Sequence, residues 1–209
     1  MRVLWLSVVI IIVDQLSKWL AFTRLRPLNE SIRILGNWFK FTYTENPGMA
    51  FGVEFGFGPP FLVTLFSIIA TVVIVVYLYS VRRGYAPYRV SLALVMGGAV
   101  GNIIDRVFYG AIHYNLPLFQ GRVVDFIHLD VWRGAWPDWI PGIGGHGFGL
   151  FPIGNVADLA IIAGVVGILF FQKRFHRHMM AEPLPASSSD NAQTTGVVDP
   201  AAEATGATN

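Results

Sequence analysis

The chain contains no cysteine and few charged residues. Only 13% of its 209 residues are Asp, Glu, Lys or Arg, whereas 54% are hydrophobic. Without cysteine there is no disulfide, no thiolate metal ligand and no cysteine nucleophile. The net charge of +2 is small and no basic patch is interleaved with aromatics, so we expect no nucleic acid partner. A composition with so few charged and so many hydrophobic residues excludes a typical soluble domain and favours a membrane protein.

Metal and serine chemistry are also poorly supported by the residues present. Of the five histidines, three are scattered through one long segment and two follow the last hydrophobic run. No His-Glu-x-x-His motif occurs, which argues against a zinc peptidase. Ser17 and Lys18 are adjacent in a helical segment, and adjacent helix residues do not face each other. We therefore expect no metal, no cofactor and no serine nucleophile.

Four hydrophobic segments are long enough to cross a bilayer as helices, which requires about 20 apolar residues. They are residues 3–22, 60–81, 88–107 and 151–172. The first has the basic start of a signal peptide, but Asp14, Gln15 and Lys18 interrupt it and no small-residue cleavage site follows cleanly. We interpret it as a retained helix. The sequence thus predicts a four-helix transmembrane domain over residues 1–180.

Basic residues predict the orientation of these spans. Residues 82–89 hold three arginines, and residues 173–178 hold one lysine and two arginines. The positive-inside rule places both segments in the cytoplasm, and with them both termini. The loop at 23–59 is basic as well, but its glutamates partly offset the charge. After residue 180, small and polar residues replace large apolar ones, which predicts a disordered cytoplasmic tail over 181–209.

The two outer segments carry signs of structure. Apolar and polar residues alternate over 39–44, the period of a strand with one apolar face. Asn46-Pro47-Gly48 then predicts a turn. The second outer segment, 108–150, holds three tryptophans among many glycines. Because tryptophan prefers the headgroup level, we expect this segment to be a loop on the membrane surface.

Polar side chains inside the spans form clusters near the predicted outer ends. Their spacings of three and four residues put the members of a cluster on one helix face. The clusters are Asp14 with Gln15 and Lys18, then Asn102 with Asp105 and Arg106, and finally Asn155 with Asp158. Charged residues at such depths are costly and are functional candidates by default. Three glycines of the third span, at 97, 98 and 101, predict close helix packing.

Each cluster also has a structural alternative. Asp14 and Lys18 could be an ion pair that pins helix packing, and Asp105 with Arg106 could mark a helix end. Asn155 could cap the last helix. In that case Asp158 would be a first-turn carboxylate that the helix dipole favours. Taken singly, these roles are about as probable as functional ones, but all the clusters lie at one depth.

A second carboxylate, Asp125 in Val123-Val124-Asp125-Phe126-Ile127, could meet Asp158 at the outer face. Two carboxylates at close range cannot both ionise cheaply, so they share a proton. One can then activate water as a base while the other polarises a carbonyl as an acid. This is the chemistry of an aspartic peptidase. A small proton-coupled transporter and a membrane scaffold with structural ion pairs remain the alternatives.

Five segments in order along the four spans resemble lipoprotein signal peptidase (signal peptidase II), the bacterial inner-membrane aspartyl endopeptidase family. They are Asp14-Gln15-Leu16-Ser17-Lys18, Asn46-Pro47-Gly48-Met49-Ala50-Phe51, residues 97–106 (GGAVGNIIDR), Val124-Asp125-Phe126 and Asn155-Val156-Ala157-Asp158. Two features depart from the family. Gly154 stands where a large aromatic is more usual, and the segment between Asp125 and Asn155 is long.

The resemblance implies cleavage of diacylglyceryl-modified prolipoproteins on the amino side of the lipid-bearing cysteine. It makes Asp125 and Asp158 the catalytic dyad, with the site toward the outer face of the inner membrane. The strand at 39–44 would belong to an outer β-cradle. Membrane lipids are further expected partners, and a monomer would suffice because one chain supplies both aspartates. The predicted substrate-binding and supporting residues are Asp14, Lys18, Asn46, Gly48, Asn102, Asp105, Arg106 and Asn155.

Overall fold

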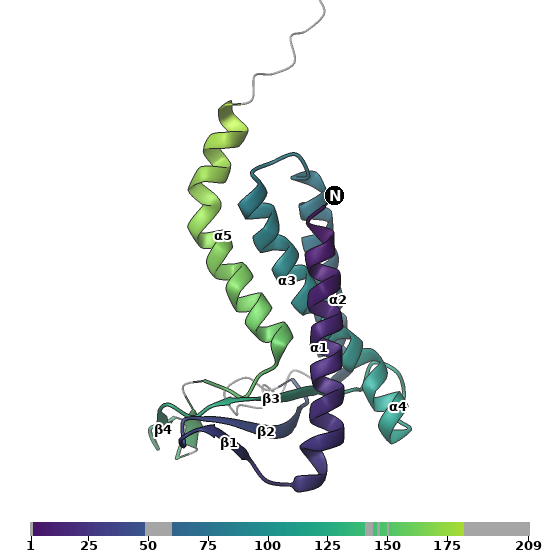
Figure 1. The fold of residues 1–209 in the computed structure, drawn as a ribbon, viewed down its shortest axis with the longest axis vertical. Coiled ribbons are helices and arrows are strands. Elements are labelled where there is room, and N and C mark those ends of the chain that lie inside the picture. Colours follow the sequence, from purple (N-terminus) through teal and green to yellow (C-terminus); the bar gives the residue numbers. More distant parts are fainter. Residues whose placement is uncertain (1, 49–59, 141–143, 146, 150, 182–209) are drawn as a thin grey trace, which may run out of the picture.

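A computed structural model describes residues 2–48, 60–140, 144–145, 147–149 and 151–181 of the chain. Four of its helices are long and apolar enough to cross a membrane. Their bounds are α1 (Leu4–Arg24), α2 (Pro60–Ser80), α3 (Ala86–Ile104) and α5 (Val156–Ala181). Helix α3 packs against each of the other three (Figure 1). The predicted fold class, a four-helix membrane protein with a small β element, is confirmed, whereas the predicted tail at 182–209 lies outside the described residues.

Two helices end at other residues than we predicted. The helical segment that begins with α3 does not stop near Val107. After Ile104 it continues through a π-helical turn, η2 (Asp105–Tyr109), and a short helix, α4 (Gly110–Tyr114). Asp105 and Arg106 therefore do not mark a helix end. The last helix begins at Val156 rather than at 151, because the side chain of Asn155 caps it, and it extends to Ala181 rather than 172.

The glycines of α3 bring two neighbouring helices close to its backbone. A Cβ atom added at Gly97 would lie 2.9 Å from the Ser7 Cα of α1, and one added at Gly98 would clash with the Ala157 carbonyl oxygen of α5. At Gly101 the added atom would lie 2.7 Å from an Asp14 carboxylate oxygen. The packing role that we predicted for these glycines is confirmed, and at Gly101 the close approach involves a polar side chain.

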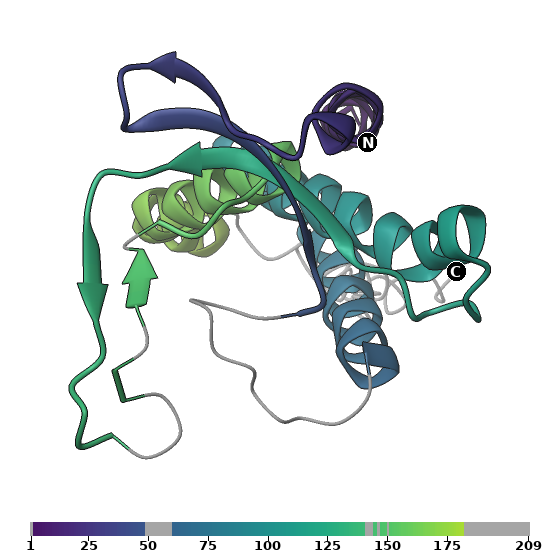
Figure 2. The ribbon, with the colours of Figure 1, turned by 90° about the horizontal axis from the view of Figure 1, so that it is seen from below.

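A three-stranded antiparallel sheet lies across one end of the helices (Figures 1 and 2). Its strands, in spatial order, are β1 (Ile32–Leu35), β2 (Phe39–Asn46) and β3 (Val123–Leu129). The predicted strand at 39–44 is thus confirmed and runs two residues further. A 3-10 turn, η1 (Arg26–Leu28), leads from α1 to this sheet. The sheet is anchored where Ala21 of α1 and Leu25, the residue that follows α1, pack on Val124 and Phe126 of β3.

The segment at 108–150 is more ordered than the surface loop that we predicted. It begins with the end of η2 and with α4, which continue α3, and it contains the whole of β3. It then forms a small hairpin of β4 (Arg133–Ala135) and β5 (Gly147–Gly149), which pair antiparallel. Strand β3 could not be expected from this segment alone, because its partner β2 lies about 80 residues earlier in the chain.

Candidate active site

Two aspartates from different elements meet where the sheet joins the helices. Asp125 lies in β3 and is 1% exposed, and Asp158 lies in the first turn of α5. The side-chain amide of Asn155 donates to Asp125 Oδ1 at 2.7 Å, and its backbone N–H donates to Asp158 Oδ2 at 3.1 Å. One residue therefore holds both carboxylates, which places them beside each other.

The helix cap and the paired aspartates are the same structure. Asn155 Oδ1 accepts a hydrogen bond from the Asp158 backbone N–H at 3.0 Å, while Asp158 accepts the Asn155 N–H in return. This reciprocal arrangement is a capping box. The other oxygen of Asp158 accepts from Asn102 Nδ2 at 2.9 Å. The capping role that we considered as an alternative is thus present, and it fixes the Asp158 carboxylate in position.

A short extended segment before α5 aligns Asn155 with Asp125. Gly154 pairs with Ile127 of β3: the Gly154 N–H donates to the Ile127 carbonyl at 3.0 Å, and the Ile127 N–H donates to the Gly154 carbonyl at 2.7 Å. This pairing places Asn155 beside β3, so that its amide reaches Asp125. The two aspartates are 33 residues apart in the sequence, and the pairing of Gly154 with Ile127 brings their segments together.

The environment of Asp125 favours its protonated form. Burial raises the pKa of its carboxyl, and the negative charge of Asp158 raises it further, to about 7 from its ordinary value of 3.8. Hydrogen bonds from Asn46 and Asn155 act in the opposite direction on this pKa and are outweighed. A group of this kind holds a proton close to neutral pH.

A buried ion cluster supports the aspartate pair from the side of α1. The ammonium of Lys18 lies 2.8 Å from an oxygen of Asp14 and 2.8 Å from an oxygen of Asp105. It also donates to Asn102 Oδ1 at 2.9 Å. Since Asn102 donates in turn to Asp158, the cluster and the pair form one hydrogen-bonded network.

Both carboxylates of this cluster also bind backbone next to the aspartate pair. Asp14 Oδ1 accepts the N–H of Ala157, the neighbour of Asp158, at 2.9 Å. Asp105 Oδ2 accepts the N–H of Val124, the neighbour of Asp125, at 3.2 Å. The cluster therefore fixes the two chain segments that carry the pair.

An arginine lies near the pair, beside the turn that follows β2. The Nη1 atom of Arg106 is buried and has no hydrogen-bond partner among the residues that the structure describes. The turn is formed as predicted, because Asn46 Oδ1 accepts the Gly48 N–H at 2.8 Å and Gly48 has a φ of 116°. A Cβ atom at Gly48 would lie 3.5 Å from Arg106 Nη1, so glycine lets the turn approach this guanidinium.

Comparison with known proteins identifies the family of this chain. The family model described as signal peptidase (SPase) II matches residues 6–173. The chain belongs to the signal peptidase II family. Curated relatives named lipoprotein signal peptidase include one from Amoebophilus asiaticus, 39% identical over 78% of this chain and 74% of its own length. Another, from Pelodictyon phaeoclathratiforme, is 34% identical over 90% of this chain and 98% of its own length.

Solved structures agree on the fold. Two described as bacterial membrane enzymes have TM-scores of 0.58 and 0.56 against this chain, with 23% and 25% identity. The first covers 88% of this chain and 94% of the other, and the second 82% and 92%. The resemblance drawn from five short segments is therefore confirmed. The protein is an aspartic-type peptidase with several membrane spans, from a family that removes signal peptides from lipoproteins, which decides against the transporter and the scaffold.

The ten residues that the sequence predicted for the site lie in this hydrogen-bonded network or beside it. Asp125 and Asp158 form its centre, and Asn155 and Asn102 connect them to the ion cluster of Asp14, Lys18 and Asp105. Asn46, Gly48 and Arg106 border the pair on the side of the sheet. Within the described ranges, no three His, Asp or Glu side chains gather as a metal site would require.

One further residue of the network, Gln15, was named in the first polar cluster but not among the predicted supporting residues. Gln15 donates from Nε2 to Asp105 Oδ1 at 3.1 Å, to the Gly101 carbonyl at 3.1 Å and to Asp14 Oδ2 at 3.2 Å. It therefore ties α1 to α3 beside the ion cluster. Its spacing of three residues from Lys18 places both on one face of α1, as its place in the first polar cluster predicted.

Gly154, which departs from the signal peptidase II pattern, lies directly beside the pair. A Cβ atom added there would lie 2.9 Å from Asp158 Oδ2. Glycine thus leaves open the space next to one carboxylate, where a larger residue would border it.

Proposed function

We propose that this protein is an endopeptidase of the bacterial inner membrane that cleaves diacylglyceryl-modified prolipoproteins on the amino side of the lipidated cysteine, with Asp125 and Asp158 as its acid–base pair. The observation that carries this proposal is the double contact of Asn155, which holds both carboxylates in one site. The raised pKa of Asp125 supports it, because a shared proton is what this chemistry requires.

In the proposed reaction Asp125 carries the proton and Asp158 acts as the base. Asp158 takes a proton from a water molecule while the water oxygen attacks the scissile carbonyl carbon. The protonated Asp125 donates a hydrogen bond to the carbonyl oxygen as negative charge develops there. When the tetrahedral intermediate collapses, the carbon–nitrogen bond breaks and the proton taken by Asp158 passes to the leaving amine of the cysteine.

The surrounding groups position the carboxylates and the substrate and take no part in proton transfer. Asn102 and Asn155 fix the direction of the carboxylates through hydrogen bonds of 2.9 and 2.7 Å. The buried Nη1 of Arg106, which has no partner within the described part of the chain, is suited to a peptide carbonyl of the substrate. We place this site at the outer face of the membrane, where the diacylglyceryl group would remain in the lipid.

The test is cleavage by the purified full-length protein in detergent. The substrates are a prolipoprotein peptide with a diacylglyceryl cysteine and the same peptide with an unmodified cysteine. We expect mass spectrometry to find one cut, before the cysteine, in the lipidated peptide alone, and no loss of rate with EDTA. Cleavage of the unmodified peptide at an equal rate would contradict the lipid requirement. A cut at another bond would contradict the proposed function.

A further inference from the structure

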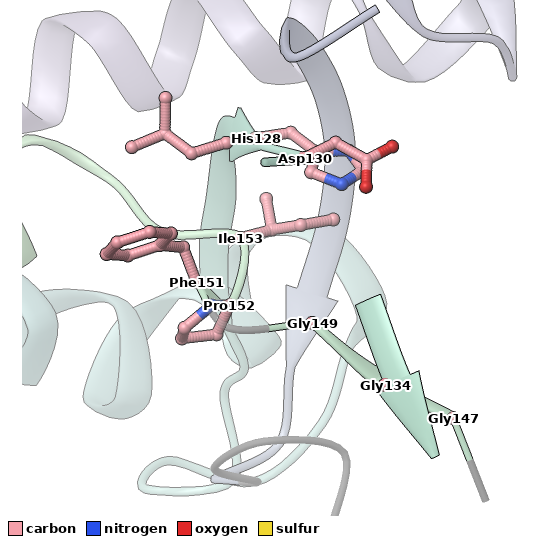
Figure 3. Close-up of a pocket in the computed structure, with 9 residues that line it drawn as sticks. His128, Asp130, Gly134, Gly147, Gly149, Phe151, Pro152 and Ile153 are labelled. Carbon is pink, nitrogen blue, oxygen red and sulfur yellow. The ribbon is translucent and has the colours of Figure 1, made fainter. Parts of the chain in front are cut away.

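The sheet carries a cavity that the proposed chemistry does not use. It has a volume of about 330 Å³, the lower end of the range for ligand sites. Figure 3 shows it between the end of β3, the β4–β5 hairpin and the segment before α5. Its apolar wall consists of Leu129, Phe151, Pro152 and Ile153. The hairpin contributes glycine backbone, and the end of β3 contributes two polar side chains.

The polar side of this cavity is held in place by bonds to β2. His128 Nδ1 lies 2.9 Å from the Thr42 hydroxyl, and the Asp130 carboxylate is paired with the Lys40 ammonium at 2.6 Å. The charge of Asp130 is therefore largely neutralised. The cavity offers a ligand an apolar wall, backbone groups of glycines and no strong net charge, which suits an extended peptide better than an ion.

Two chain segments connect the cavity to the aspartate pair. Strand β3 carries Asp125 and, four residues later on the same face of the strand, the cavity residue Leu129, a distance of about 13 Å along a strand. The other segment passes from Ile153 at the cavity through Gly154 to Asn155, which binds both aspartates. A peptide whose scissile bond lies at the pair could therefore reach the cavity within a few residues.

The place of the cavity decides which side of the scissile bond it can serve. Its lining residues all lie outside the four helices that could cross the membrane. A signal peptide is an apolar helical segment that needs the bilayer, because its backbone and side chains have no other apolar surroundings. The residues that follow the lipidated cysteine lead out of the membrane instead.

From these observations we infer that the cavity is a subsite for the first residues of the mature lipoprotein, just beyond the lipidated cysteine, bound as an extended peptide. The inference rests on the proposed function and adds a binding site on the carboxyl side of the scissile bond. The β4–β5 hairpin that closes the cavity lies in the long segment between Asp125 and Asn155. In this proposal the long segment contributes to substrate selection.

The test uses two diacylglyceryl peptides and two variants that reduce the cavity. One peptide continues for several residues beyond the cysteine, and the other ends with an amide at the cysteine itself. Leu129→Trp enlarges a wall residue. Gly147→Leu adds a side chain where a Cβ atom has its nearest neighbour, the Gly134 carbonyl oxygen, at an ordinary 3.7 Å. Ala135→Leu is the matched control, because Ala135 pairs with Gly147 in the hairpin and does not line the cavity.

We expect both cavity variants to raise KM for the long peptide about tenfold, which corresponds to about 1.4 kcal/mol of binding free energy. Their kcat, and both constants for the short peptide, should stay within twofold of the unchanged protein, as should all constants of the control. Equal losses on both peptides would overturn the inference, since the cavity would then only support the site. Unchanged KM for the long peptide would overturn it as well. Failure of the unchanged protein to cleave either peptide would instead contradict the proposed function.

Discussion

Replacing Asp125 by asparagine should raise the free energy of unfolding, and it should raise it more at pH 8 than at pH 5. The folded state raises the pKa of this carboxyl from 3.8 to about 7, so it binds the proton more tightly than the unfolded state does. The native protein therefore loses stability as pH rises from about 4 to about 7. Asparagine has a similar shape, keeps an oxygen for the bond from Asn155 and cannot ionise.

The size of this effect follows from the same pKa. One pKa unit corresponds to 1.36 kcal/mol, and between pH 5 and pH 8 the native carboxyl loses about 2 to 3 kcal/mol relative to asparagine. For a chain of this length that difference corresponds to roughly 5 to 10 °C in the midpoint of thermal unfolding. The gain in midpoint from Asp125→Asn should therefore be larger at pH 8 than at pH 5 by this amount.

The assay is thermal unfolding of the purified protein in detergent at both pH values, with Asp125→Asn compared with the unchanged protein. Asp138→Asn is the control, because Asp138 is exposed in the segment beyond β4, and it should change the midpoint little at either pH. An equal gain from Asp125→Asn at pH 5 and pH 8, or a loss at pH 8, would refute the idea that burial and a neighbouring charge disfavour the ionised form of Asp125.

Two substitutions probe the surroundings of the pair, and a reporter fusion probes the membrane orientation. Lys18→Met should lower the free energy of unfolding by about 3 to 5 kcal/mol, since it leaves the carboxylates of Asp14 and Asp105 buried without their cation; a loss below about 1 kcal/mol in denaturant unfolding would contradict this. Gly101→Ala should cost about 1 to 3 kcal/mol, because the new Cβ would lie 2.7 Å from the Asp14 carboxylate; an unchanged midpoint would show that α1 can shift freely. A periplasmic reporter fused after Arg83 should be inactive, and activity there would reverse the proposed orientation.

Local spacing was enough to predict much of the site. The four-residue separation of Asp14 and Lys18 placed them on one face of α1, where they form an ion pair. The three-residue separation of Asn155 and Asp158 corresponds to the capping box at the start of α5. Both patterns depend on helix geometry alone, which a sequence shows directly.

The contacts between elements could not be predicted in the same way. The pairing of Thr44 with Asp125 joins strands about 80 residues apart, and no periodicity within either strand specifies its partner. The π-helical turn at Asp105–Tyr109 was missed because the sequence over it looks like the end of an apolar span. Gln15 was placed in the first polar cluster but not among the supporting residues, because the sequence does not show that its amide contacts Asp105 on another helix as well as Asp14.

The central claim is that Asp125 and Asp158 act as one catalytic unit, and the most direct test is single-turnover cleavage of the diacylglyceryl peptide. The proteins to compare are the unchanged enzyme, Asp125→Asn, Asp158→Asn and the double variant, each shown to be folded by its thermal unfolding. We expect each single variant to be at least about a thousandfold slower, and the double variant to be no more than about tenfold slower again. A single variant within tenfold of the unchanged enzyme, or two independent losses that multiply in the double variant, would contradict the account.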